Sequence, residues 1–136
     1  MTKSSLNRFP HHRLDAWQVA QQLAVSAVHL TDPCPKGFAD LRDQLKRAAL
    51  STVRHIAEGA SRVSPADKRS RFVVARGECA ECDATLETAA LLELFPLDEI
   101  RRVQVLADRV SAMLTGLVRR EERRMLPRHR LTGDGP

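Results

Sequence analysis

Residues 38–59 read FADLRDQLKRAALSTVRHIAEG, and their apolar positions recur at alternating steps of three and four residues. This spacing, about 3.5 residues on average, places the apolar side chains along one face of a helix. A helix with one apolar face must bury that face against another element, so the stretch predicts one member of a helical bundle. The apolar face comprises Phe38, Leu41, Leu45, Ala48, Thr52, Ile56 and Gly59.

Three other stretches between prolines repeat this pattern. Proline is accepted in the first turn of a helix but not in its interior, so the prolines at positions 10, 33, 35, 65, 96 and 127 mark helix borders. Ser64 before Pro65, with Asp67 in the first turn, is typical of a helix start. The three apolar faces comprise Leu14, Trp17, Ala20, Ala24 and Val28; Phe72, Ala75, Cys79, Cys82, Leu86 and Ala89; and Ile100, Val103, Ala107, Val110, Leu114 and Leu117.

The four stretches predict the fold and the boundaries of the folded domain. Short connections force consecutive helices to run antiparallel, so we predict an all-α fold, an antiparallel up-down-up-down four-helix bundle with short loops over residues 13–125. Residues 1–12 would form an N-terminal extension, and the proline- and glycine-containing residues 126–136 a flexible basic tail. Trp17 is predicted to anchor the core, and His11–His12 to lie in a loop.

The composition is that of a globular protein and indicates no catalytic class. The chain has 136 residues, enough for one domain, and no apolar run approaches the ~20 residues of a membrane-spanning helix. No apolar signal core follows Met1, and the three cysteines cannot all pair. We therefore expect a cytoplasmic protein without membrane association.

Two small groups of residues have side chains typical of functional sites but lack the further ligands or catalytic groups that such sites need. Cys79 and Cys82 form a C-x-x-C, yet a zinc site needs two further ligands and no second pair exists. Both fall on a predicted core face, so we expect them to pack there. His55 and Glu58 have the spacing of a metal-ligand or acid–base pair, without an accompanying nucleophile or substrate pocket. We expect no enzyme activity, no cofactor and no metal.

Charge is segregated along the chain, although the net charge is only +5. Residues 42–76 carry nine Lys/Arg and three Asp/Glu, residues 77–99 carry seven acids and no Lys or Arg, and residues 119–136 carry six arginines and three acids. Basic zones attract polyanions, and opposed zones favour head-to-tail association of subunits, whereas a solvated charged surface needs no partner. In the predicted bundle the third helix starts where the fourth ends, so their basic charges would add.

A second, polar stripe follows the second helix at steps of three and four residues. A phosphate backbone, a partner subunit and bulk solvent are all compatible with its residue types, so the surface that it faces stays open. The polar stripe comprises Arg47, Ser51, His55, Glu58 and Arg62.

The leading functional hypothesis is backbone-directed binding of RNA or DNA, because the arginines cluster without interleaved aromatic residues that would stack on bases. The alternative is a homo-oligomeric structural or protein-interaction module, without nucleic-acid binding, in which residues 77–99 meet a basic zone of a neighbouring subunit. The candidate nucleic-acid-binding residues are Arg47, Arg54, Arg62, Lys68, Arg69, Arg71, Arg76, Arg119, Arg120, Arg123 and Arg124.

Several motifs resemble a bacterial family, the four-helix-bundle proteins encoded in intervening sequences of 23S ribosomal RNA genes. Residues 41–51, LRDQLKRAALS, followed by HIAEG at 55–59, are similar to its patterns Gln-Ile-Arg-Arg-Ala-Ala-x-Ser and Asn-Ile-Ala-Glu-Gly. Residues 14–20, LDAWQVA, look like its opening Leu-x-x-Trp-x-x-Ala, and residues 71–81 look like its Arg-Phe-x-x-x-Ala-x-Gly-Ser with a downstream Glu. His55 replaces the family's Asn, and Glu78 its Ser.

The resemblance covers residues 9–120 and implies a four-helix bundle that assembles into a ring-like homo-oligomer, commonly a pentamer. It also relates the chain to the accessory proteins of diversity-generating retroelements, which pair with a reverse transcriptase and bind nucleic acid. The partners it implies are further copies of this chain, RNA or DNA, and a reverse transcriptase.

Overall fold

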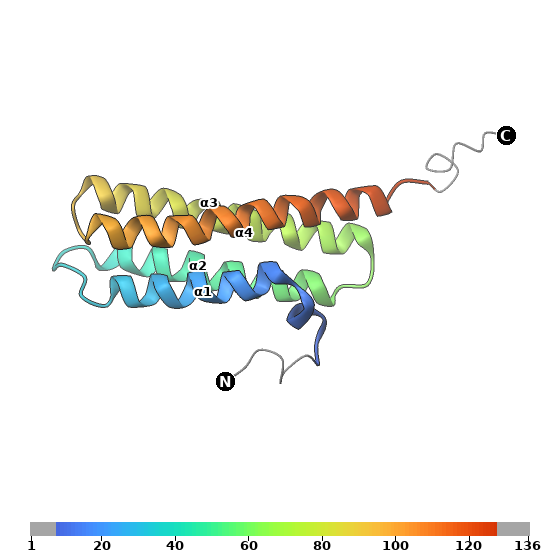
Figure 1. The fold of residues 1–136 in the computed structure, drawn as a ribbon, viewed down its shortest axis with the longest axis horizontal. Coiled ribbons are helices and arrows are strands. Elements are labelled where there is room, and N and C mark those ends of the chain that lie inside the picture. Colours follow the sequence, from blue (N-terminus) through green and yellow to red (C-terminus); the bar gives the residue numbers. More distant parts are fainter. Residues whose placement is uncertain (1–7, 128–136) are drawn as a thin grey trace.

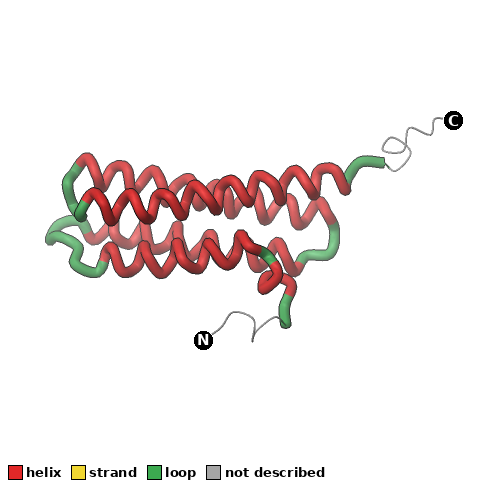
Figure 2. The backbone as a smooth tube through the Cα atoms, viewed as in Figure 1, coloured by secondary structure: helices red, strands yellow, loops and turns green. Residues whose placement is uncertain are grey.

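The computed structural model describes residues 8–127, and this part of the chain contains helices and loops but no strand (Figure 2). The prediction of an all-helical chain with four long helices is confirmed for these residues. Residues 1–7 of the predicted extension and 128–136 of the predicted tail lie outside the described residues. The helices are α1 (Asp15–Thr31), α2 (Ala39–Ser61), α3 (Pro65–Leu91) and α4 (Leu97–Arg124), and a short 3-10 helix, Pro10–Arg13, precedes α1.

The four helices lie side by side along one long axis, and the connections join them at alternate ends (Figure 1). Contacts across α3 and α4 pair Arg69 with Glu122, Arg76 with Thr115 and Glu87 with Arg101. The partner's number falls as the residue number rises, which is the order expected for helices that run in opposite directions. None of the described helices is long and apolar enough to cross a bilayer.

The bundle has two ends that differ in which helices begin and finish there. At the basic end, α2 and α4 finish and α1 and α3 begin; at the turn end, the α3–α4 connection, residues 92–96, lies beside the connection from α1 to α2 (Figure 1). Ser64 caps the start of α3, since its hydroxyl accepts a hydrogen bond from the Asp67 amide at 3.1 Å, as the sequence predicts.

The predicted apolar faces of α2, α3 and α4 form most of the core. The six residues predicted for α3 are the six that it buries, and in α2 every predicted residue from Leu45 onward is buried. In α4 the prediction holds as far as Leu114, after which Val118 and Glu121 are buried while Leu117 is half-exposed. The stripe continues through α4 to its last turn, one residue out of the predicted register.

The buried face of α1 is wider than the predicted stripe. Ala20 and Ala24 are buried as predicted, whereas Leu14 and Val28 are half-exposed. Like the other helices, α1 packs against two neighbours, α2 and α4, and it buries two adjacent rows of side chains. The additional buried residues are Ala16, Val19, Leu23, Ala27, Leu30 and Thr31.

The start of α1 agrees with the predictions only in part. Trp17 packs against the core as predicted, but it is half-buried at the margin, where its ring centroid is 4.7 Å from that of His11 and 5.4 Å from that of His12. The two histidines belong to the 3-10 helix and not to a loop. Burial, and then the neighbouring His12, lowers the pKa of His11 below its ordinary value.

Cys79 and Cys82 pack in the core, as predicted, and Cys79 also links two helices. Its thiol donates a hydrogen bond to the carbonyl of Ala107 in α4 at 3.2 Å. Burial raises the pKa of Cys79 to about 11 and that of Cys82 to about 12. Both are therefore thiols, not thiolates, near neutral pH, and poor nucleophiles.

α2 and α3 approach each other closely at Gly59. A methyl group at this position would lie 2.7 and 2.8 Å from two carbons of the Phe72 ring, and 3.2 Å from Cβ of Arg71. The Phe72 ring is fully buried and has no free space into which to move. Glycine is therefore required at position 59 for the helices to approach this closely. Gly77 in α3, by contrast, has open space around it.

We expect Gly59→Ala to destabilise the fold by about 1–3 kcal/mol, because the methyl group overpacks against Phe72. Gly77→Ala is the matched control. It has the same change in a helix interior without a clash, so it should stabilise the protein by up to about 1 kcal/mol. Urea unfolding followed by circular dichroism measures both values. Equal effects of the two substitutions would contradict the role assigned to Gly59.

Thiol modification tests the burial of the two core cysteines. At pH 8 an aromatic disulfide reagent should label Cys34, which is half-exposed, well before Cys79 and Cys82. The latter two should react only as fast as the protein unfolds. Since their pKa is raised on folding, stability should fall as pH rises above the ordinary thiol pKa of 9 toward 11. Fast labelling of three thiols in the native protein would exclude this packing.

Candidate nucleic-acid interface

The basic end gathers side chains from two helices that are distant in sequence. Lys68 and Arg69 lie in the first turn of α3, and residues 119–124 form the last turns of α4. Arg69 Nε donates to Glu122 Oε2 at 2.8 Å, which fixes the two segments side by side. We refer to Arg62, Lys68, Arg69, Arg119, Arg120, Arg123 and Arg124 as the basic cluster.

Two of the predicted arginines belong to the sides of the bundle. Arg71 lies 3.9 Å from the carboxylate of Glu58 in α2, and Arg76 donates to the Thr115 hydroxyl at 3.4 Å. At ~1.5 Å per residue, Arg76 is about 10 Å along α3 from Arg69. Both therefore serve contacts between helices, and their role in binding nucleic acid stays a prediction.

A carboxylate that the sequence analysis overlooked lies within the basic cluster. Glu121 is 0% exposed, and it accepts hydrogen bonds from Arg120 Nε at 2.8 Å and from Arg124 Nη1 at 3.0 Å. A buried carboxylate is tolerated only when it is paired and hydrogen-bonded in this way. The sequence held one signal for it, since Glu121 is seven residues after Leu114 and so continues the apolar face of α4.

The ammonium group of Lys68 binds the C-terminal end of α2. Its Nζ donates to the carbonyls of Ala60 at 2.8 Å and Gly59 at 3.4 Å. A cation at a helix C-terminus satisfies carbonyls that have no partner within the helix and interacts favourably with the helix dipole. Burial is the main cause that lowers the pKa of Lys68. Lys68 thus stabilises the α2–α3 connection.

Arg119 and Arg123 differ from their neighbours Arg120 and Arg124, which pair with Glu121. Both are exposed, and among the residues that the structure describes neither forms an ion pair. Arg62, at the end of α2, is exposed as well. These three guanidinium groups face solvent at one end of the bundle.

The polar stripe lies along the boundary between α2 and α3. Ser51 is buried, and its hydroxyl accepts a hydrogen bond from Arg54 Nη2 at 3.1 Å. His55 Nδ1 lies 2.8 Å from the carbonyl of Ser51, so this nitrogen is the donor. His55 and Glu58 each have a partner of their own, respectively the Ser51 carbonyl and Arg71. They are not arranged as an acid–base pair.

A groove of about 420 Å³ separates the other half of the polar stripe from α3. Arg47 and Ser51 line it on α2, and Glu78 and Glu81 line it on α3. Carboxylates outnumber guanidinium groups there, so the groove does not attract a polyanion as the basic cluster would. Arg47 is also about 22 Å along α2 from Arg62, at ~1.5 Å per residue. A role of the polar stripe in binding nucleic acid stays a prediction.

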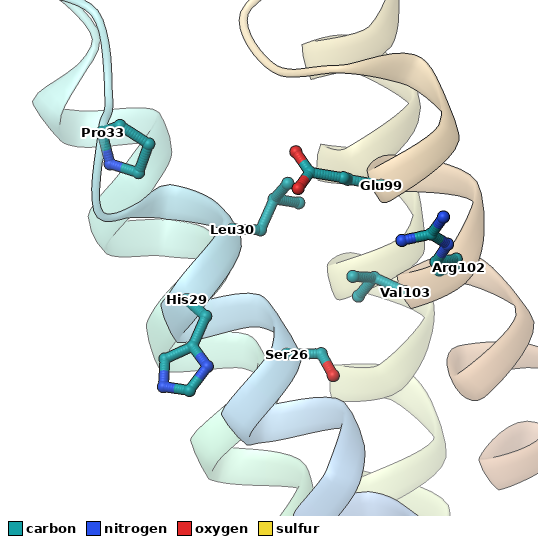
Figure 3. Close-up of a pocket in the computed structure, with 7 residues that line it drawn as sticks. All are labelled: Ser26, His29, Leu30, Pro33, Glu99, Arg102 and Val103. Atoms are coloured by element: carbon teal, nitrogen blue, oxygen red, sulfur yellow. The ribbon is translucent and has the colours of Figure 1, made fainter.

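A smaller pocket, of about 290 Å³, lies near the turn end between α1 and α4 (Figure 3). Glu99 and Arg102 extend from α4 on its rim, Leu30 and Val103 provide apolar walls, and His29 points away from it (Figure 3). Its two charges are opposite and exposed. Within residues 8–127, no group of three or more His, Cys, Asp or Glu side chains has the arrangement of a metal site.

We expect Glu121→Gln to destabilise the protein by about 1–3 kcal/mol, because the buried side chain loses its charge-assisted hydrogen bonds to Arg120 and Arg124. Glu122→Gln, one residue further on, is the matched control. It removes the same charge from the half-exposed pair with Arg69 and should change stability by no more than about 1 kcal/mol. Thermal and urea unfolding measure the difference. Similar losses for both variants would show that Glu121 is not the buried partner.

A family model described as 23S rRNA-intervening sequence protein matches residues 12–116, well over half of the chain. The matched region contains α1, α2, α3 and most of α4, and it ends before Arg119. Among curated proteins, no significant match to the chain was found. The family match agrees with the motifs in α1, α2 and α3, whose residues form the core and the polar stripe. The chain belongs to the 23S rRNA-intervening sequence protein family.

Proposed function

We propose that this protein is a non-enzymatic, oligomeric nucleic-acid-binding protein whose basic end contacts the RNA or DNA backbone. The observation that carries the proposal is the pair Arg119 and Arg123, two exposed cations one turn apart on α4 with no ion pair among the described residues. Arg62 on α2 adds a third exposed cation at the same end. Guanidinium groups that project from a helix end are well suited to phosphate oxygens.

The neighbouring ion pairs support this role by holding the interface in shape. Arg120 and Arg124 are held by the buried Glu121, and Arg69 by Glu122. Side chains that ion pairs already hold in place lose little conformational freedom when a phosphate binds nearby. The ion-paired arginines add to the positive electrostatic potential of the basic end, and the exposed arginines contact the phosphate groups.

The absence of enzyme activity remains part of the proposal. His55 donates to a backbone carbonyl and Glu58 lies beside Arg71, so neither side chain is poised to move a proton to or from a substrate. The buried thiols are protonated near neutral pH, which makes them unsuited to nucleophilic attack.

Self-association is the second component, and exposed apolar side chains favour it. Val25 on α1 and Val105 on α4 are both more than half exposed, and Val25 lines a shallow groove together with Leu106. An antiparallel bundle that packs through this α1–α4 face would form the ring-like homo-oligomer, commonly a pentamer, that the family resemblance implies. A homo-oligomeric module without nucleic-acid binding is the alternative function, and the following titration separates the two.

Fluorescence anisotropy with labelled single- and double-stranded RNA and DNA, over a series of salt concentrations, tests the proposed binding. We expect log affinity to fall linearly with log salt, with a slope of about −0.7 to −0.9 per phosphate contact. Arg119→Ala combined with Arg123→Ala should weaken binding at least tenfold and reduce this slope, because two contacts are lost.

Arg101→Ala combined with Arg102→Ala is the matched control, since it removes two exposed arginines from the same helix at the turn end. This variant should retain the affinity of the unmodified protein. Equal losses in both double variants would mean that net charge alone drives binding. No binding at low salt would reject the proposal and favour the homo-oligomeric module.

A further inference from the structure

Three leucines are exposed at the turn end, where a helical bundle normally has polar residues. Leu91 is 82% exposed, Leu97 is 56% exposed and Leu92 is 47% exposed. We refer to Leu91, Leu92 and Leu97 as the leucine patch. They contrast with Phe95 in the same connection, which is buried. Adjacent exposed apolar side chains of this size are typical of a surface that a partner covers.

The geometry of α3 and α4 places the patch on one surface. Glu87 on α3 accepts hydrogen bonds from Arg101 at 2.9 Å and from Gln104 at 2.8 Å on α4. Leu91 is four residues after Glu87, and Leu97 is four residues before Arg101, so each lies one turn further toward the connection on the same helix faces. The two leucines therefore flank the same outer seam between α3 and α4.

Acidic side chains surround the leucine patch. Glu93, Asp98 and Glu99 are exposed within the connection and the first turn of α4, and hydrogen bonds from Gln104 and Arg101 lower the pKa of Glu87 below its usual value. Glu93 has a φ of 55°, a conformation that glycine adopts at no steric cost. Arg101 and Arg102 pair with Glu87 and Asp98 respectively, which leaves a net negative rim.

The chain itself contains a segment of matching chemistry. Residues 125–131 read MLPRHRL, in which three apolar residues are followed by Arg-His-Arg and then a leucine. Met125 and Leu126, which the structure describes, are 48% and 45% exposed. The segment combines apolar groups for the leucines with cations for the acidic rim. We refer to it as the MLPRHRL segment.

A copy's own MLPRHRL segment cannot reach its own leucine patch. The segment leaves α4 at the basic end, while the patch lies at the turn end, about 42 Å away along the 28 residues of α4 at ~1.5 Å per residue. Seven extended residues span at most about 25 Å, at ~3.5 Å per residue. The contact must therefore join two copies.

We propose that the MLPRHRL segment of one copy docks on the leucine patch of a second copy. Each copy has one patch and one segment, so the contact is head-to-tail and joins bundles end to end, in addition to the side-by-side contact through the α1–α4 face. Burial of the apolar side chains supplies the attraction, and the acidic rim selects a basic segment over an acidic one. The leucine patch is separate from the nucleic-acid interface, because it lies at the opposite end of the bundle.

A labelled peptide of residues 123–132 tests the proposal with the full-length chain as receptor. The receptor carries Met125→Ser and Leu126→Ser so that its own segment does not compete. We expect a saturable rise in anisotropy, and at least tenfold weaker binding once Leu91→Ser and Leu97→Ser are added. Leu50→Ser with Val74→Ser, two exposed apolar side chains on the sides of α2 and α3, should leave the affinity unchanged.

A second peptide with serine in place of Met125, Leu126 and Leu131 keeps every charge and should bind at least tenfold more weakly. Equal binding of the two peptides, equal binding to the leucine variant, or no binding to the receptor would each overturn the proposal. Circular dichroism confirms that the variants fold. Arg119→Ala with Arg123→Ala in the receptor should not alter peptide binding, so the outcome is independent of nucleic-acid binding.

Discussion

The close contact between Gly59 and the Phe72 ring sets the distance between α2 and α3, and several other features depend on that distance. It brings the end of α2 within reach of Lys68, whose ammonium group binds the carbonyls of Gly59 and Ala60. It also brings Arg71 close to Glu58. Because helix packing in a core is dense, a wider spacing here would separate each of these pairs.

The basic end shows how a small protein can concentrate positive charge without losing stability. Like charges at one end of a bundle repel one another, and this repulsion would destabilise the compact state. Glu121 and Glu122 offset it from within the cluster, since one holds Arg120 and Arg124 and the other holds Arg69. Arg119 and Arg123 remain exposed on the same turns of α4.

The two ends of the molecule differ in both charge and apolar exposure. The basic end carries arginines from α2, α3 and α4, whereas the turn end carries exposed leucines and a net negative rim. In the proposals above, the first is an interface for phosphate groups and the second an interface for another copy of the chain. The family match ends within α4, so Arg119, Arg120, Arg123 and Arg124 lie outside the matched region, whereas Arg62, Lys68 and Arg69 lie within it.

Much of the fold could be predicted from the sequence because helical periodicity is a local property. The borders of the helices, the cap at Ser64 and the buried faces of α2 and α3 follow from residues a few positions apart. The motif around His55 and Gly59 was sufficient to indicate the family. Prediction was incomplete in α1, whose buried face is wider than the single predicted stripe, and at Trp17, which packs at the margin of the core beside His11 and His12.

The sequence by itself determined the four helices, their apolar faces and the number of arginines near residues 119–124. Only the tertiary structure decided which of those arginines form ion pairs with Glu121 and which are exposed without an ion pair among the described residues. Arg69 and Glu122 are 53 positions apart, and the burial of Glu121 depends on what packs around the last turn of α4. Ion pairing and burial depend on distances between residues far apart in the chain, and local periodicity carries no information about those distances.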